Sequence, residues 1–321
     1  MKNLLNEIET ALKSLDYPQR PEGLYEPIEY ILSAGGKRIR PTLALLAYSL
    51  YRDDFQRAMP AALALEIYHN HTLLHDDLMD NADVRHGMPT VHRRWNANTA
   101  VLSGDTMLIM AFRKAMQTDC PRKEELLQVF AQTMQEVCEG QQYDVNFESR
   151  NDVSVDEYLE MIRLKTSVLL ACALKMGALA ADAPAADAQQ LYRFGELIGL
   201  AFQLQDDYLD CYGDPAVFGK SIGGDILCGK KTFLLTTALQ RATPQQHAQL
   251  LAAINGTNLD NGAKIKRVLE LYEDLNIPQL CHERIETLYS EAETVLSQLP
   301  LPAERKQPLY DFARRMLKRE K

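Results

Sequence analysis

The stretch LLHDDLMDNADVRHG, from Leu73 to Gly87, places four aspartates within eight positions directly after an apolar run. Because the preceding residues follow a helical period, Asp76 and Asp80 are predicted to share one helix face, with Asp77 about 100° further round. Carboxylates this close repel one another unless they pair, become protonated or bind a cation, and such oxygen ligands suit Mg²⁺. One DDxxD motif alone is equally typical of a solvated acidic helix end.

A second stretch, FQLQDDYLDCYGD from Phe202 to Asp214, repeats this spacing with Asp206, Asp207 and Asp210. Coincidence is a poor explanation for two copies that both follow an apolar helical face. Two such helices facing each other would supply six carboxylates. That number could hold several Mg²⁺ ions around a polyanionic ligand such as a diphosphate.

The chain as a whole predicts an all-α fold, because helical periodicity dominates and strand-like alternation is nearly absent. Helix starts are marked by Pro60 and by capping boxes at Ser154 and Thr243. We expect about ten or more helices in a single domain over residues 1–321, since no linker separates two compositions. Residues 33–41, 81–90, 119–123 and 212–231 are expected to lie outside helices.

Composition and charge exclude several classes of protein. A chain with 46% hydrophobic and 25% charged residues is neither disordered nor fibrous. The net charge of −9 argues against binding to nucleic acid or anionic membranes. Six cysteines without CxxC spacing are typical of a cytoplasmic protein without disulfides. The most apolar stretch, 168–181, contains a lysine and is shorter than the ~20 residues that span a bilayer, so no integral membrane segment is expected.

Local basic segments stand out in this acidic chain. Lys37, Arg38 and Arg40 follow two glycines, Arg85 follows the first aspartate motif, and three lysines follow the second, at positions 220, 230 and 231. Glycine lets backbone amides approach an anion, and lysine and arginine suit phosphate. Taken alone, the first segment fits a plain basic turn equally well.

Six segments now complete a pattern: GGKRIRP, EIYHNHTLLHDDLMD, RHGMPTVH, RLKTSVL, FQLQDDYLD and GKSIGGDILCGKKT. Their order and spacing resemble the trans-isoprenyl diphosphate synthases, the polyprenyl synthetase family, from about Ser33 to Thr232. The resemblance implies an all-α bundle around a deep central cavity, usually homodimeric and Mg²⁺-dependent, with about three ions beside the bound diphosphate. It also implies the head-to-tail joining of an allylic diphosphate to isopentenyl diphosphate, with release of pyrophosphate.

The resemblance further implies roles for individual residues. Asp76, Asp80 and Asp206, assisted by Asp77, Asp207 and Asp210, would hold Mg²⁺ on the allylic diphosphate. The cations expected at that diphosphate are Arg85, Lys165, Lys220 and Lys230. Isopentenyl diphosphate would be received by Lys37, Arg40 and His69, and the carbocation would form beside Thr166 and Gln203. Each basic residue, taken singly, also fits a solvated or structural role.

One position departs from the family pattern, which usually reads RRG where this chain has Arg85-His86-Gly87. Arginine is always charged, whereas histidine with its ordinary pKa of about 6.5 is mostly neutral at pH 7. The resemblance implies that the second arginine assists isopentenyl diphosphate, so His86 would take that place here. We therefore expect the KM for isopentenyl diphosphate to increase as the pH rises above 7.

Product length is expected to depend on His71 and Thr72, just before the first motif. Bulky aromatic residues there stop elongation early and small residues permit long chains, so this intermediate pair favours farnesyl or geranylgeranyl diphosphate (C15 to C20). The first motif also lacks a two-residue insertion common in bacterial farnesyl-type enzymes, which favours C20 slightly.

Three alternatives stay open at this point. His69, His71 and the pair His75-Asp76 resemble ligands of an HD-type metal phosphohydrolase, although that leaves the second motif without a role. A terpene cyclase shares the first motif but normally mixes Asn, Ser and Glu in its second metal site. A catalytically silent regulatory subunit should have lost one of the acidic or basic sets, and both are present.

Overall fold

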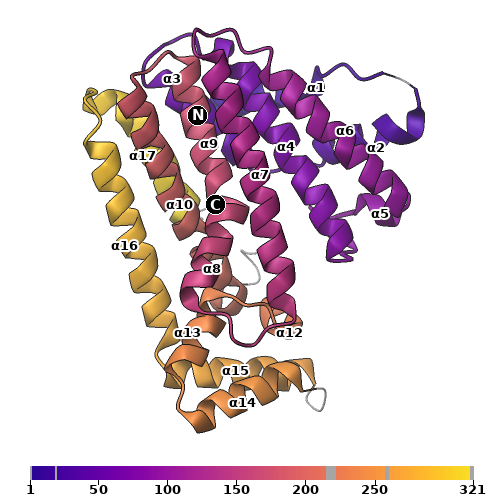
Figure 1. Ribbon diagram of the computed structural model, residues 1–321, viewed down its shortest axis with the longest axis vertical. Coiled ribbons are helices and arrows are strands. Elements are labelled where there is room, and N and C mark those ends of the chain that lie inside the picture. Colours follow the sequence, from indigo (N-terminus) through magenta and orange to yellow (C-terminus); the bar gives the residue numbers. More distant parts are fainter. Residues whose placement is uncertain (1, 19, 215–221, 257–259, 319–321) are drawn as a thin grey trace. The chain divides into compact units, whose positions relative to one another are not determined.

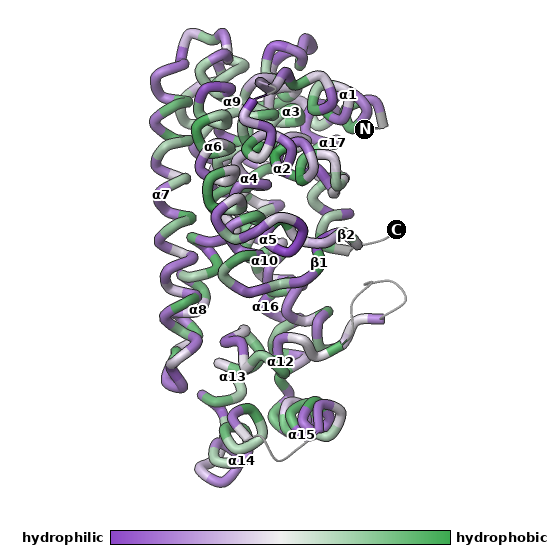
Figure 2. The backbone as a smooth tube through the Cα atoms, turned by 90° about the vertical axis from the view of Figure 1, so that its right-hand side faces the viewer, coloured by the Kyte–Doolittle hydropathy of each residue, from purple (hydrophilic) through white to green (hydrophobic). Residues whose placement is uncertain are grey.

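The computed structural model describes residues 2–18, 20–214, 222–256 and 260–318. Apart from one short hairpin, its regular elements are helices, so the all-α prediction is confirmed (Figure 1). Hydrophobic and hydrophilic residues are interspersed along the helices, as expected of amphipathic segments (Figure 2). Among the described residues, no helix combines the length and apolar character needed to cross a membrane.

Two compact units divide the chain. Unit 1 comprises residues 1–132, 172–191 and 300–309, and unit 2 comprises residues 133–171, 192–299 and 310–321. The prediction of one synthase domain over residues 1–321 stays a prediction, and each unit is described by itself.

Residues 2–115 form these elements: α1 (Lys2–Lys13), α2 (Glu22–Ser33), α3 (Ile39–Ser49), the 3₁₀ helix η1 (Phe55–Ala58), α4 (Met59–Met79), β1 (Val84–Arg85), β2 (Met88–Pro89), α5 (Val91–Arg94) and α6 (Ala97–Ala115). All of them belong to unit 1. The helices α7 (Lys123–Glu148), α9 (Val168–Ala180), α10 (Ala185–Tyr212) and α17 (Ala303–Lys318) contribute residues to both units.

The remaining elements belong to unit 2: α8 (Val155–Ile162), the π-helical turn η2 (Arg163–Ser167), α12 (Gly224–Cys228), α13 (Phe233–Arg241), α14 (Pro244–Asn255), α15 (Asn261–Asp274) and α16 (Ile277–Ser297). Both predicted capping boxes are present, at Ser154 with Glu157 and at Thr243 with Gln246. The expectation that residues 212–231 lack helix is wrong in part, because α12 occupies 224–228.

Helix α4 is the core of unit 1 and carries the first aspartate motif at its end. Pro60 opens it, and every side chain from Ala61 to Tyr68 is buried. Beyond Asn70 burial becomes periodic, which leaves the last turns partly open. α4 packs most extensively against α6, where Gly104 is required because a Cβ there would lie 2.1 Å from Nε2 of His75.

Helix α10 carries the second motif, in its unit 2 portion. Its buried side chains recur every three or four residues, at Phe194, Leu197, Ile198, Ala201 and Leu204. This apolar stripe anchors the helix, while Gln203, Asp206 and Asp210 lie off the stripe and stay partly exposed.

Candidate active site

The first aspartate motif ends α4, and its three carboxylates lie in different environments. The side chain of Asp76 is 22% exposed and that of Asp77 only 4%. Asp80 caps the C-terminus of the helix and is exposed. Asp76 and Asp80 therefore form the outer pair that the helical spacing predicted, while Asp77 is turned inward.

Asp77 binds the arginine of the following hairpin. Arg85 Nε donates to Asp77 Oδ1 at 2.7 Å, and Arg85 Nη2 lies 3.8 Å from Asp76 Oδ2. Burial raises the pKa of Asp77 to about 6, against the opposing effect of Arg85. The middle aspartate is thus a buried anchor for Arg85 and is not presented to solvent as a metal ligand.

The hairpin of β1 and β2 positions Arg85 through a tight turn. Val84 pairs with Pro89 and Arg85 with Met88, in antiparallel register. The two turn residues, His86 and Gly87, have φ of 50° and 77°, which matches a type I′ turn. A Cβ on Gly36 would lie 3.8 Å from Cε1 of His86, so the glycine loop and the hairpin turn are neighbours in unit 1.

The loop GGKRIRP divides its basic residues between two directions. Gly35, Gly36 and Arg38 have φ of 82°, 143° and 48°. This backbone turns the Arg38 guanidinium inward, where it donates to Glu9, Glu66 and the carbonyl of Leu32. Arg38 belongs to the predicted basic segment but was given no substrate role, and its contacts are those of a structural residue.

Arg40 and His69 form the centre of a positive cluster in unit 1. Within the described part of the chain, Arg40 Nε is buried without a hydrogen-bond partner. Burial lowers the pKa of Arg40 to about 10, although Glu66 opposes the change. The pKa of His69 is lowered well below its ordinary value by burial and then by Arg40, Arg85 and His86. A neutral imidazole surrounded by cations is an arrangement that an anion would stabilise.

The two predicted chain-length residues lie on α4 beside α6. His71 is buried, and its Nδ1 donates to the carbonyl of Gly104 at 2.9 Å. Burial and then His75 lower the pKa of His71 to about 4. Thr72 Oγ1 donates to the carbonyl of His69. A neutral, backbone-bound His71 fits an apolar wall better than it fits the ligand set of a metal phosphohydrolase.

The second motif repeats the inward middle aspartate. Asp207 is 2% exposed and accepts hydrogen bonds from Tyr158, Gln203 and the amide of Phe233. Burial and then Asp225 raise the pKa of Asp207 to about 7. Asp206 and Asp210 remain partly exposed.

Asp210 also orders the segment that brings Lys230 to the site. Its Oδ2 accepts from the amide of Asp225 at 3.0 Å, and its carbonyl accepts from Gly223. Lys230 Nζ lies 3.9 Å from Asp225 Oδ1. Burial alone would lower the pKa of Lys230, but Asp225, Asp207, Asp144 and Asp206 together raise it. Lys230 therefore stays charged beside the second motif, while Lys220 lies outside the described residues.

The π-helical turn η2 presents Lys165 and Thr166. Lys165 Nζ lies 2.6 Å from Asp144 Oδ2, and Thr166 Oγ1 donates to Gln203 Oε1 at 3.1 Å. Since Gln203 Nε2 in turn donates to Asp207 Oδ1, hydrogen bonds connect three predicted site residues of unit 2, Thr166, Gln203 and Asp207. Asp144, Tyr158 and Asp225 were not predicted as site residues. Asp144 and Tyr158 lie outside the six motif segments, and Asp225 lies within GKSIGGDILCGKKT but was given no role. The available signal was the position of Asp225 between the second aspartate motif and Lys230.

The donor set fits Mg²⁺ shared with a ligand better than a protein-only metal site. Among the described residues, no three His, Cys, Asp or Glu side chains converge closely enough to hold a metal ion. Mg²⁺ commonly binds one or two carboxylates and completes its octahedron with water and phosphate oxygens. Asp76 with Asp80, and Asp206 with Asp210, are the pairs that could serve in this way.

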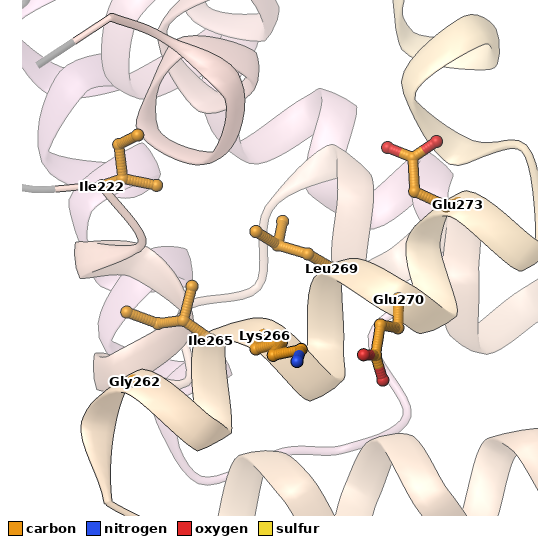
Figure 3. A pocket seen from close by; sticks show the side chains of 7 residues that line it. All are labelled: Ile222, Gly262, Ile265, Lys266, Leu269, Glu270 and Glu273. Carbon is orange, nitrogen blue, oxygen red and sulfur yellow. The ribbon is translucent and has the colours of Figure 1, made fainter.

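A separate pocket in unit 2 contains none of these residues. Ile222, Ile265 and Leu269 line its apolar wall, and Glu270 and Glu273 lie along α15 at its side (Figure 3). A second, smaller pocket in unit 1 is lined in part by Asp77, Arg85 and His86. Three predicted site residues of unit 1 therefore line the smaller pocket, whereas none of those that the structure describes lines the apolar pocket of α15.

Comparisons with known proteins show which family this chain is similar to. The sequence matches the polyprenyl synthetase family over residues 21–272. It is 40% identical over 271 residues to a short chain isoprenyl diphosphate synthase of Methanocaldococcus jannaschii, covering 84% of this chain and 82% of that protein. It is 41% identical over 243 residues to a geranylgeranyl diphosphate synthase of Methanosarcina mazei, covering 75% of each. A crystal structure of a geranylgeranyl pyrophosphate synthase, 42% identical, matches with a TM-score of 0.93 and covers 100% of this chain and 99% of that one. The resemblance inferred from the motifs is confirmed, and the chain belongs to the polyprenyl synthetase family.

Proposed function

We propose that this protein joins isopentenyl diphosphate to an allylic diphosphate (dimethylallyl, geranyl or farnesyl) and releases pyrophosphate. The product would be a short-chain all-trans prenyl diphosphate. The main support for this proposal is that each aspartate motif presents two outer carboxylates next to a positively charged side chain, Arg85 in unit 1 and Lys230 in unit 2. Family membership overturns the phosphohydrolase and terpene cyclase alternatives.

In this proposal the outer aspartates hold the metal and the basic side chains hold the diphosphate. Asp76, Asp80 and Asp206 would hold about three Mg²⁺ ions, which when bound neutralise charge on the departing pyrophosphate. Arg85 beside the first motif, and Lys165 and Lys230 beside the second, would donate to diphosphate oxygens, since preorganised donors stabilise developing charge better than water does. The middle residues Asp77 and Asp207 would act through the groups they anchor.

The positive cluster of unit 1 supports a separate site for isopentenyl diphosphate. Arg40 has a buried donor that lacks a partner among the described residues. Lys37 is exposed in the adjoining glycine loop, and His69 lies among the cations. An incoming diphosphate would satisfy the Arg40 donor and offset the repulsion between these charges.

For product length we propose C20 over C15. The relatives compared above include a geranylgeranyl diphosphate synthase, and His71 is held against α6 as part of a wall of moderate bulk. A neutral imidazole bound to a backbone carbonyl is compatible with an apolar isoprenoid tail, because it brings no charge into the wall.

We also propose that the protein is a cytoplasmic homodimer that pairs through α6. Leu102 and Ile109 of α6 and its C-cap residue Met116 are 59%, 61% and 51% exposed. They lie seven residues apart, which places them along one side of the helix. An exposed apolar stripe of this kind is typical of a helix-pairing surface. Ile109→Glu should convert a dimer to a monomer in light-scattering measurements, whereas Asp105→Glu on the same face should not; an unchanged mass for both would exclude this surface.

The deciding experiment is incubation with Mg²⁺, labelled isopentenyl diphosphate and each of the three allylic starters, followed by chain-length analysis. Asp80→Asn serves as the control for dependence on the first motif. Elongation that stops at C15 or C20 would support the proposal. No product from any starter, with pyrophosphate and Mg²⁺ still bound in calorimetry, would instead indicate a catalytically silent subunit.

A further inference from the structure

The turn η2 interrupts an otherwise α-helical run between α8 and α9. Its backbone widens to an i→i+5 bond, with the amide of Val168 donating to the carbonyl of Arg163. Ser167 Oγ repeats this offset by donating to the carbonyl of Ile162. Turns of this kind are rare and occur frequently at functional sites. Here the turn contains Lys165 and Thr166, two of the residues proposed to act on the allylic substrate.

Two glycines from different helices lie directly against this turn. A Cβ on Gly140 of α7 would lie 2.3 Å from the amide nitrogen of Lys165 and 2.7 Å from the carbonyl carbon of Leu164. A Cβ on Gly199 of α10 would lie 2.6 Å from Cα of Ser167 and 2.7 Å from its Cβ. The obstructing atoms at Gly140 are backbone, and those at Gly199 include a Cα. A side chain at either position would therefore displace the turn itself.

Each of these two helices also binds a side chain of η2, through a polar residue one helical turn after its glycine. Asp144 follows Gly140 by four positions and binds Lys165, and Gln203 follows Gly199 by four positions and accepts from Thr166. Residues four apart share a helix face. Each helix thus contacts the backbone of the turn with its glycine and fixes a side chain of the turn with its polar residue.

We propose that Gly140 and Gly199 are positioning residues, which set the place of η2 so that Lys165 and Thr166 meet the substrate. The inference rests on the proposed prenyl transfer and goes beyond it by assigning roles to two residues that contact no substrate. Gly140 acts through Lys165 and therefore on diphosphate binding. Gly199 acts through Thr166 and Gln203 and therefore on the reacting carbon.

Alanine substitutions separate these roles from general packing. Gly140→Ala and Gly199→Ala should each lower kcat by about 100-fold, the cost of a displacement of about 1 Å at a reacting group. The KM for isopentenyl diphosphate should stay within about threefold, because that substrate is assigned to unit 1. Gly177→Ala is the matched control: its Cβ would lie 2.1 Å from the carbonyl oxygen of Ala44, an equally tight helix contact without a proposed site residue. It should lower the melting temperature without this selective loss of kcat.

A binding measurement without turnover distinguishes the inference from the proposed function. Calorimetry with inorganic pyrophosphate and Mg²⁺ should show that Gly140→Ala lowers the affinity for pyrophosphate about tenfold, because one charged contact from Lys165 is lost. The affinity of Gly199→Ala should be unchanged. If the wild-type protein makes no product but the two variants still differ in pyrophosphate binding in this way, the proposed prenyl transfer is refuted while the role of Gly140 stands. If wild-type protein is active and Gly177→Ala loses as much kcat as the other two variants, the positioning roles are refuted.

Hydrogen exchange of the wild-type protein provides a measurement that needs no variant to fold. A turn clamped by two helices should protect the amide of Val168 as strongly as the amides within α9. Rapid exchange at Val168 would show that η2 is not held in place and would overturn the proposal.

Discussion

Replacing Glu66 with glutamine should destabilise the protein far more than the same change at Glu9. Both carboxylates bind the Arg38 guanidinium at the same distance, 2.7 Å. They differ in exposure, because the side chain of Glu66 is 4% exposed and that of Glu9 is 38% exposed. The pair of variants therefore isolates the effect of burial on one guanidinium.

The magnitude follows from these contacts. Removing one partner of a buried ion pair costs about 3–5 kcal/mol, whereas an exposed pair contributes at most about 1 kcal/mol. Glutamine retains an acceptor oxygen for Arg38 and for Asn70, and Glu9 still offsets the positive charge. We therefore expect Glu66→Gln to lower the free energy of unfolding by about 2–3 kcal/mol and Glu9→Gln by at most about 1 kcal/mol.

Urea unfolding followed by circular dichroism measures both values, provided that the slopes of the transitions agree. Raising the salt concentration to about 1 M should shrink the effect of Glu9→Gln and leave that of Glu66→Gln, because buried charges are screened less. The KM for isopentenyl diphosphate should also rise in Glu66→Gln, since Arg38 holds the loop that carries Lys37 and Arg40. Equal losses of stability in the two variants would refute the reasoning that burial sets the cost.

Three further outcomes concern side chains of unit 1. Burial and then His75 lower the pKa of His71 to about 4, so His71 takes up a proton more readily in the unfolded chain, where its pKa is about 6.5. Its contribution to the free energy of unfolding is therefore complete above about pH 6.5 and is lost as the pH falls towards 4. From about pH 6.5 to pH 5, the free energy of unfolding measured in urea should fall by roughly 2 kcal/mol more in the wild-type protein than in His71→Gln. Equal decreases in the two proteins would count against this role of His71. His86→Arg should lower the KM for isopentenyl diphosphate and remove its rise above neutrality, because arginine stays charged; an unchanged pH profile would show that His86 does not meet this substrate. Thr72→Phe should shorten the product towards C15 by filling space about one turn before Asp76, and chromatography showing an unchanged product would place the chain-length wall elsewhere.

Much of the fold could be predicted from local signals. The capping boxes at Ser154 and Thr243 and the proline that opens α4 mark helix starts through hydrogen bonds within a few residues. Such signals do not depend on the rest of the chain. Helix α12 was missed because its five residues lie between Gly223 and Gly229, both at positive φ, in a segment that reads as a loop.

The candidate site was only partly predictable, because spacing gives the relative directions of side chains and not which direction is buried. The four-residue spacing correctly grouped Asp76 with Asp80. It could not show that the side chain of Asp77 would be buried or that Arg38 would turn inward. The direction of Arg38 depends on a left-handed backbone angle, and its partner Glu66 lies 28 positions away. Pairs so distant in sequence leave no mark within any motif.

The inward aspartates suggest why each motif has two adjacent acids. In unit 1 the middle residue, Asp77, binds Arg85 of the hairpin that follows the motif. In unit 2 the middle residue, Asp207, accepts from the amide of Phe233 at the start of α13, three positions after Lys230. A carboxylate at a helix N-terminus is stabilised by the helix dipole, which favours this placement.

Each motif thus has two tasks divided between neighbouring positions. The outer carboxylates remain available to a cation, while the middle carboxylate anchors the downstream segment that supplies a basic side chain. Because adjacent residues on a helix point about 100° apart, one acid can face outward while the next is buried. A single aspartate could not meet both demands, since the burial that raises the pKa of Asp77 to about 6 and that of Asp207 to about 7 would weaken a metal ligand, which must be deprotonated. Two adjacent aspartates are therefore needed in each motif, one to bind a cation and one to hold the basic side chain of the following segment beside it.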